Sequence, residues 1–399
     1  MKIYLGYCKP SKIFGLLCVK YVIVLFVVFS PLFSEADELS DLRQKVERQQ
    51  KEINELSHDL EKLEQVVGVN ETTSIKPIFG ANMGIFGDIN FSTNSREKAK
   101  NSFYLGEIDL YSTGSYGDRL TFLSEIVIEG EENGFIIDVE RLWAGYRFSD
   151  ILMVMAGKEH TALGYWNKEY HHGKQLFLTV ARPFFLNFED EGGVIPMHIT
   201  GLHFTGSWGD NFARFKYDIN IGNGSHINHA KRELMSDDIR DENNSKAIVL
   251  RISARPNSVP NLAVGLSGAD FRLDTSAKAD VNERVYGIDI EYEHKGFEFV
   301  TEYFRLVNSD AVGNGFYAQL GYSIMENITL YARFESLETD RSDPYLNDLR
   351  GGIERRQTIA GVKYDVDAVH SSIKAQYRYD DAKDGNDYNV FELQWSFGF

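Results

Sequence analysis

Histidine and acidic residues gather in one stretch of the chain and could bind a transition metal, because imidazole and carboxylate groups are ligands for such metals. Five of the ten histidines lie within 44 residues. No pair among them has the i, i+4 spacing of a helical site or the tight repeat of a zinc site. Ordinary hydrogen bonding and packing is the alternative that we favour, so we expect no bound metal and no cofactor. The five are His160, His171, His172, His198 and His203.

Covalent catalysis has less support still. Serine, histidine and aspartate occur throughout a chain of 399 residues, but no serine lies in the sequence context of a nucleophile elbow. We therefore expect that the protein is not an enzyme.

The remaining polar chemistry is electrostatic. Charged residues recur at every second position of several runs, out of phase with apolar neighbours. If positive and negative side chains lie on separate parts of a water-facing wall, they would orient and select ions. A water-facing wall on which the two signs are mixed is the alternative. The basic positions are Arg214, Lys216, Arg251, Arg333, Lys363, Lys374 and Arg378, and the acidic ones are Glu107, Asp109, Glu125, Asp289, Glu291, Glu298, Glu302, Glu335 and Glu392.

The elements that carry these charges are strands, as the C-terminus illustrates. Phe391, Leu393, Trp395, Phe397 and Phe399 alternate with polar residues up to the end of the chain. A period of two gives a strand one apolar and one polar face. Four aromatic residues on one face are typical of an outer-membrane barrel, in which that face meets lipid. The last strand of a soluble β-sandwich is the alternative.

The same alternation, combined with the turn residues between the runs, predicts sixteen strands. Seven tight turns alternate with eight longer polar loops, which is the pattern of an even-stranded antiparallel transmembrane β-barrel. Fourteen or eighteen strands remain alternatives. After residue 36 no apolar run approaches the roughly eighteen residues of a transmembrane helix. The predicted strands are 77–92, 102–113, 119–129, 135–148, 151–159, 196–207, 211–221, 245–255, 261–273, 283–293, 297–307, 315–324, 328–338, 355–366, 369–380 and 386–399.

Two segments precede the barrel, which is expected over residues 69–399. Residues 1–36 combine four lysines, the apolar run 21–29 and a small-x-small site ending at Ala36, which predicts a secretory signal peptide. An uncleaved anchor is the alternative. Both cysteines fall in this segment, so the mature chain has none with which to form a disulfide.

Residues 37–68 carry an unbroken heptad register, which predicts a short coiled-coil helix and hence a homo-oligomer. A lone amphipathic helix is the alternative. The mixture of residue types at the core positions leaves open whether two or three helices associate. The register positions are Leu39, Leu42, Val46, Gln49, Ile53, Leu56, Leu60, Leu63 and Val67.

The charge balance bears on partners. The chain has a formal net charge of −17, and the basic signal segment makes the mature protein more acidic still. An acidic surface repels phosphate backbones, so we expect no nucleic-acid partner.

A signal, a coiled coil, sixteen strands and a terminal phenylalanine resemble the trimeric outer-membrane porins. The resemblance is greatest to porins related to the phosphate-selective group, some of which carry an N-terminal coiled coil. It covers the architecture of the whole chain, but no residue signature specifies a solute. It implies a homotrimer in the outer membrane, with the coiled coil in the periplasm. It also implies a water-filled channel for the passive diffusion of ions and small hydrophilic solutes.

In porins the third long loop folds into the barrel and narrows it, which assigns that role to segment 160–195; an external cap is the alternative. By this resemblance Glu189, Asp190 and Glu191 would form an acidic edge that faces a basic strip. The acidic balance predicts a weak preference for cations. A structural or adhesive barrel that anchors the envelope, or an outer-membrane enzyme, are the alternative functions. The basic strip consists of Arg333, Lys363, Lys374 and Arg378.

Overall fold

The computed structural model of the chain describes residues 79–96, 100–131, 134–170, 173–236, 240–241, 245–273, 280–383 and 387–399. The expected signal peptide and coiled coil therefore lie outside the described residues. In the part that is described, no helix is both long and apolar enough to cross a membrane.

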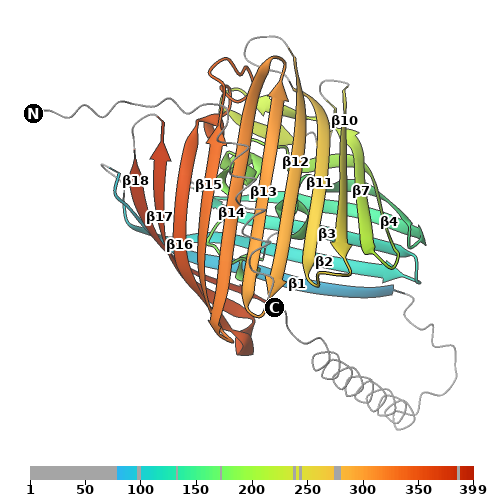
Figure 1. The fold of residues 1–399 in the computed structure, drawn as a ribbon, viewed down its shortest axis with the longest axis horizontal. Helices are drawn as coiled ribbons and strands as arrows, with labels where there is room; N and C mark the ends of the chain where they lie inside the picture. The colour runs from blue at the N-terminus through green and yellow to red at the C-terminus, as the bar shows by residue number, and fades with distance from the viewer. Residues whose placement is uncertain are drawn as a thin grey trace, which may run out of the picture. The chain divides into compact units, whose positions relative to one another are not determined.

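Sixteen antiparallel strands form a closed barrel (Figure 1). Closure joins the first strand to the last. The final residue takes part, because the Phe399 amide donates to the carbonyl of Ile85 at 2.9 Å. The predicted sixteen-stranded barrel is confirmed. Its strands are β1 (Phe79–Asn94), β2 (Ser102–Tyr116), β3 (Leu120–Glu131), β4 (Gly134–Ser149), β5 (Leu152–His160), β6 (His198–Gly209), β7 (Ala213–Asn223), β10 (Lys246–Pro256), β11 (Leu262–Leu273), β12 (Val281–His294), β13 (Phe297–Asn308), β14 (Ala311–Met325), β15 (Ile328–Glu338), β16 (Arg355–Val366), β17 (Ser371–Ala382) and β18 (Tyr388–Gly398).

The two-residue period gives the wall its two faces. On β18 the side chains of Leu393 and Trp395 are 39% and 49% exposed and lie on the outside. Glu392, Gln394 and Ser396 between them are buried in the interior. Exposed large apolar side chains recur on the other barrel strands as well. An apolar surface of this extent requires contact with lipid, so we treat the barrel as membrane-spanning.

Two features of the connections differ from the sequence-based expectation. The segment 222–244 contains a separate hairpin, β8 (Ser225–Asn228) and β9 (Glu233–Ser236), which pairs only within itself. Strands of four residues are too short to establish an alternating pattern, which is why the sequence did not reveal them. The turn between β13 and β14 has two residues, because β14 begins at Ala311 rather than at 315.

The longest connection, 161–197, contains short helices and is largely buried. Its α-helix and 3₁₀ turns are α3 (Trp166–Glu169), η1 (Lys174–Leu176), η2 (Phe184–Leu186) and η3 (Glu189–Glu191). Two further 3₁₀ turns, η4 (Arg350–Gly352) and η5 (Asp367–Val369), lie on either side of β16.

An apolar core fills part of the barrel interior. Trp166 and Phe185 of the long connection pack there with inward-facing residues such as Val249 on β10 and Phe304 on β13. Tyr345, from the segment between β15 and β16, belongs to the same core. Burying a large apolar side chain stabilises a fold by roughly 1.5–3 kcal/mol. This core therefore fixes the long connection against the β10–β15 side of the wall.

The strand β4 has a free edge at its N-terminal half. It pairs with β3 from Gly134 to Tyr146, but with β5 only from residue 142 onward. A bulge at Glu140 and Arg141 separates the two halves, and both bulge residues are buried. Ahead of the bulge, Phe135 and Ile137 are 67% and 69% exposed. An unpaired apolar strand edge is a ready site for association with another chain.

Candidate functional site

The backbone of the long connection is bonded to a carboxylate on the inner wall. Glu302 on β13 accepts hydrogen bonds from the amides of Tyr165 and Trp166 at 2.8 and 2.9 Å. Gly164 precedes them with a φ of +73°, and a Cβ at that position would lie 1.9 Å from the same carboxylate. Only glycine allows this close approach of the loop to the wall.

Arg333 on β15 holds a second part of the connection. Its guanidinium donates to the carbonyl oxygens of Ala181 and Arg182, both at 2.9 Å. It also pairs with Glu335 at 2.6 Å, and Glu335 in turn accepts the Phe184 amide at 2.6 Å. All these groups are buried or nearly so. Arg333 was predicted to line the channel, but its N–H groups donate hydrogen bonds to the carbonyl oxygens of the loop.

The remaining cations of the basic strip, Lys363, Lys374 and Arg378, face inward as expected, and each has partners. Arg214, which was also predicted to face inward, is exposed. Lys374 on β17 donates to the carbonyl of Thr179 at 3.1 Å, and to that of Lys174. Lys363 on β16 pairs with Asp365 at 2.9 Å. Two members of the basic strip, Arg333 and Lys374, thus fasten the connection to the wall instead of facing an acidic edge across a gap.

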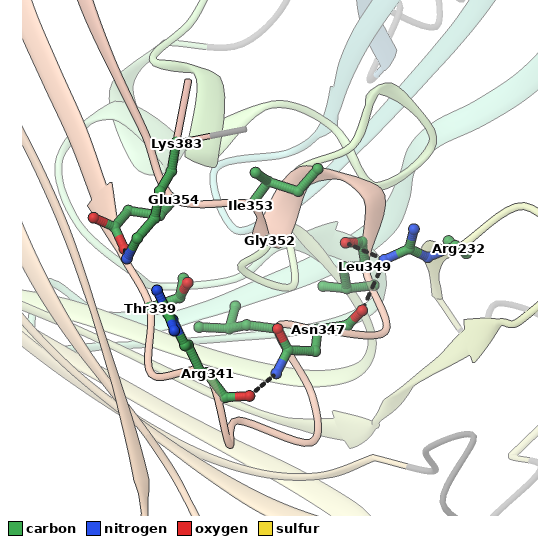
Figure 2. Close-up of a pocket in the computed structure, with 10 residues that line it drawn as sticks. Arg232, Thr339, Arg341, Asn347, Leu349, Gly352, Ile353, Glu354 and Lys383 are labelled. Atoms are coloured by element: carbon green, nitrogen blue, oxygen red, sulfur yellow. Dashed lines mark hydrogen bonds and ion pairs between the residues drawn. The ribbon is translucent and has the colours of Figure 1, made fainter. Parts of the chain in front are cut away.

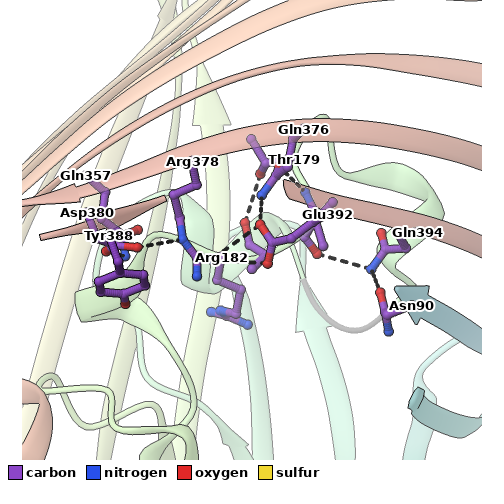
Figure 3. Close-up of polar contacts among 12 residues, drawn as sticks. Asn90, Thr179, Arg182, Gln357, Gln376, Arg378, Asp380, Tyr388, Glu392 and Gln394 are labelled. Carbon is purple, nitrogen blue, oxygen red and sulfur yellow. Dashed lines mark hydrogen bonds and ion pairs between the residues drawn. The ribbon is translucent and has the colours of Figure 1, made fainter. Parts of the chain in front are cut away.

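Arg378 belongs to a polar network over β16–β18 (Figure 3). It donates to Asp380 at 2.9 Å and to Glu392 at 3.2 Å. Glu392 also accepts the side-chain amide of Gln376 at 2.6 Å, and the Gln376 oxygen accepts the Val180 amide at 3.0 Å. The network links the wall to the inserted loop, so the charge of Arg378 is held at a fixed position.

The three predicted acids of η3 separate in the structure. Glu189 is buried, and its carboxylate accepts the amides of Met197 and His198 at 2.8 and 2.9 Å and bonds the His198 ring at 2.9 Å. Asp190 and Glu191 are exposed. Glu189 therefore fastens the end of the loop to the start of β6. The expectation that all three form one edge has to be corrected for Glu189.

A cavity of about 240 Å³ lies between the connection and the wall formed by β18, β1, β2 and β3. Four carboxylates and two cations line it, which gives the lining a formal net charge of −2. Three of the carboxylates come from the wall, and two of them, Glu107 and Glu392, were predicted to be inward-facing acids. Both cations come from the loop, for which the sequence predicted an acidic edge. Its polar lining residues are Asn90, Tyr104, Glu107, Glu129, Lys174, Arg182, Glu191, Glu392 and Gln394.

Lys174 crosses from the loop towards the acidic wall. Its ammonium lies 3.5 Å from Asp88 on β1 and 3.4 Å from Glu107 on β2. Burial disfavours its charge, but the carboxylates of Glu107 and Asp88 outweigh burial and raise the pKa of Lys174. On the exposed tip of the loop, desolvation and the carboxylate of Glu191 raise the pKa of Asp190 to about 6. The shift of Lys174 reflects an excess of negative charge around it, whereas the shift of Asp190 reflects burial first and the carboxylates of Glu191 and Glu189 second.

The histidines make structural contacts. His198 bridges two carboxylates, at 2.7 Å from Glu140 on the β4 bulge and 2.9 Å from Glu189. His160 and His203 bond backbone carbonyls at 3.1 and 3.0 Å. Among the described residues, no group of three or more histidine, cysteine, aspartate or glutamate side chains is arranged to hold a metal ion. The other two histidines of the stretch lie outside that part of the chain.

A second cavity, also of about 240 Å³, lies among the segments that join the strands at the loop end (Figure 2). Arg232, from the β8–β9 turn, donates to the carbonyls of Asn347 and Leu349 at 2.7 and 3.3 Å. Lys383 pairs with Glu354 on its other side. These contacts tie the hairpin to the segment 339–354, which covers the apolar core.

Sequence reasoning missed both loop cations of the first cavity. Lys174 and Arg182 lie in a connection without a strand period, so no phase indicated where their side chains point. Glu129 lies in a predicted strand, and it has the inward phase of its neighbours Glu125 and Val127 on β3. That phase could have identified it as a lining residue.

No protein-family model matches the sequence, and no curated protein sequence matches it. Solved structures do match. An anion-selective porin from Comamonas acidovorans aligns over 80% of this chain and 100% of its own, with a TM-score of 0.56 and 10% identity. The chain has a porin-like fold. The outer-membrane channel DcaP of Acinetobacter baumannii covers 82% of this chain and 99% of its own, with a TM-score of 0.56 and 11% identity.

A third structure, the outer-membrane protein OmpT of Vibrio cholerae in its trimer form, covers 80% of this chain and 100% of its own. Its TM-score is 0.51 and its identity is 13%. At such identities the likeness concerns the fold alone.

Proposed function

We propose that the protein is an outer-membrane porin. It forms a water-filled channel for the passive diffusion of ions and small hydrophilic solutes, and segment 160–195 constricts that channel. The observation that carries the proposal is the charged cavity between the inserted loop and the wall of β18 and β1–β3. An apolar outer face and a polar inner face are what a barrel needs to hold water within lipid.

The cavity also supports a selectivity. Its lining carries a formal net charge of −2, and negative charge beside a narrow water path lowers the energy of cations there. Lys174 and Arg182 on the opposite side keep anions permeant. The proposed channel therefore prefers cations weakly, which is the preference that the acidic sequence predicts.

Planar-bilayer recordings of the purified protein test this function. We expect discrete ion-conducting steps, and in a KCl gradient a reversal potential displaced modestly towards that of K⁺. A closed barrel without conductance would contradict the porin proposal and favour an adhesive or enzymatic barrel. A clear chloride preference would contradict the proposed selectivity alone, and would favour a role like that of phosphate-selective porins.

We also propose that the protein assembles as a homotrimer in the outer membrane. The free edge of β4 supports this, because an unpaired strand edge flanked by the exposed Phe135 and Ile137 is a surface on which a second copy could pack. The Vibrio cholerae OmpT structure with a similar fold is described as a trimer. The heptad register of residues 37–68 adds a second contact between copies.

Deletion of residues 37–68 is expected to weaken the oligomer but leave the barrel folded, because the barrel strands pair without that segment. Mass measurement in mild detergent would show the full-length protein as a trimer and the deletion variant as a mixture with monomer. A monomeric mass for the full-length protein would contradict the proposal.

A further inference from the structure

The carboxylate of Glu283 is buried, and none of the residues that the structure describes forms a hydrogen bond with it. Glu283 lies near the start of β12 and is 0% exposed. Among the described residues, neither of its carboxylate oxygens has a hydrogen-bond partner. Its neighbour across the β11–β12 pair is Phe271, and Val281 and Val285 of the apolar core flank it along β12. An isolated charge in such surroundings is strongly disfavoured, so the carboxylate needs either a proton or a cation.

Two more oxygen-bearing groups lie beside it. Asn308 on β13 is the direct cross-strand partner of Glu283. Asn308 is also fully buried, and its side-chain oxygen has no hydrogen-bond partner among the described residues. Its amide nitrogen donates to Asp343 at 2.9 Å. Directly opposed residues on neighbouring strands lie close enough for their side chains to share one ligand.

Asp343 is oriented by the loop that carries it. Its Oδ1 accepts the backbone amides of Tyr345 and Leu346 at 2.9 and 2.8 Å. The other oxygen, Oδ2, accepts the hydrogen bond from the side-chain amide of Asn308. The second carboxylate thus comes from the segment 339–354, whereas Glu283 and Asn308 come from the barrel wall.

We propose that Glu283, Asn308 and Asp343 form a binding site for a calcium ion. Two carboxylates and one amide oxygen are hard ligands, and Ca²⁺ accepts six to eight such oxygens in flexible geometry. The remaining positions would be filled by backbone carbonyls or water. The site contains neither histidine nor cysteine, which argues against a transition metal.

Such an ion would join the segment 339–354 to the wall. Tyr345 of that segment donates its hydroxyl to the Val194 carbonyl at 2.8 Å, so the segment also contacts the long inserted connection. Calcium would therefore stabilise the cover of the apolar core at the loop end. This inference does not depend on what the channel conducts.

Terbium luminescence tests the site directly, because Tb³⁺ replaces Ca²⁺ and is sensitised by a nearby tyrosine such as Tyr345. The full-length protein, purified in detergent without lipopolysaccharide and freed of metal with EDTA, would be titrated with TbCl₃ and then with CaCl₂. We expect saturable luminescence that CaCl₂ displaces. Glu283→Gln should lower the affinity at least tenfold, because it keeps the shape but removes the charge.

The matched control is Glu338→Gln, which removes an exposed acid at the end of β15, just before the same segment, and should leave the affinity unchanged. Asn308→Ala is a second variant and should weaken binding several-fold if Glu283→Gln does not fold. Wild-type protein without Ca²⁺-displaceable luminescence would overturn the proposal and assign a proton to Glu283. Equal binding by Glu283→Gln, or by a folded Asn308→Ala, would overturn it as well, because the ion would then lie elsewhere.

Discussion

Replacement of Arg333 by methionine is expected to raise the single-channel conductance severalfold. Arg333 donates to the Ala181 and Arg182 carbonyls and to the Thr179 hydroxyl. Methionine fills a similar length but donates no hydrogen bond. Removal of one partner of a buried charge pair costs about 3–5 kcal/mol, and here it also leaves Glu335 without its cation. The loop should then leave the wall around residues 179–184 and open the constriction.

Single-channel recordings in concentrated KCl provide the measurement. Arg356→Met is the matched control, because Arg356 lies on the neighbouring strand β16 and is exposed. Arg333→Lys should give an intermediate conductance, since lysine keeps the charge but lacks the planar donor geometry. An unchanged conductance in a folded Arg333→Met barrel would show that the loop does not limit the flow of ions.

The double replacement Glu129→Gln/Glu191→Gln is expected to abolish the cation preference. Both residues line the cavity beside Lys174 and Arg182, and their loss changes the formal net charge of the lining from −2 to zero. Two unit charges about 4 Å apart in water interact by about 1 kcal/mol, which corresponds to roughly a fivefold change in partition. The ratio of K⁺ to Cl⁻ permeability should therefore fall by about that factor or more.

Reversal potentials in a KCl gradient measure this ratio. Asp310→Asn/Glu326→Gln removes the same charge from two exposed turn residues outside the cavity, so it should leave the reversal potential unchanged. Glu189 is left intact in this design, because it bonds His198 and its loss would disturb the loop itself. An equal shift in the cavity variant and in the control would place the selectivity in the overall charge of the protein.

The barrel could be predicted from the sequence because a strand period is local. In β18 each residue from Phe391 to Ser396 faces outward or inward according to its position alone. The same rule placed Lys363 and Lys374 in the interior correctly. It failed for β8 and β9, where four residues are too few to establish a period.

The phase of a strand also cannot show what a side chain meets inside the barrel. Arg333 was assigned to the interior, but its partners are carbonyls about 150 residues earlier in the chain. Nothing near Arg333 in the sequence indicates that a loop would reach it. Its role as a fastening of the loop therefore emerged only from the tertiary structure.

The sequence by itself determined the strands of the barrel and their two faces, since neighbouring residues and the contrast between lipid and water set these features. Only the tertiary structure decided which charges line the cavity, because Lys174 and Glu129 meet through the folding of a loop that has no period. It likewise brought Glu283 and Asn308 close to Asp343. These contacts depend on where distant segments approach each other, and packing of the whole barrel interior fixes that approach.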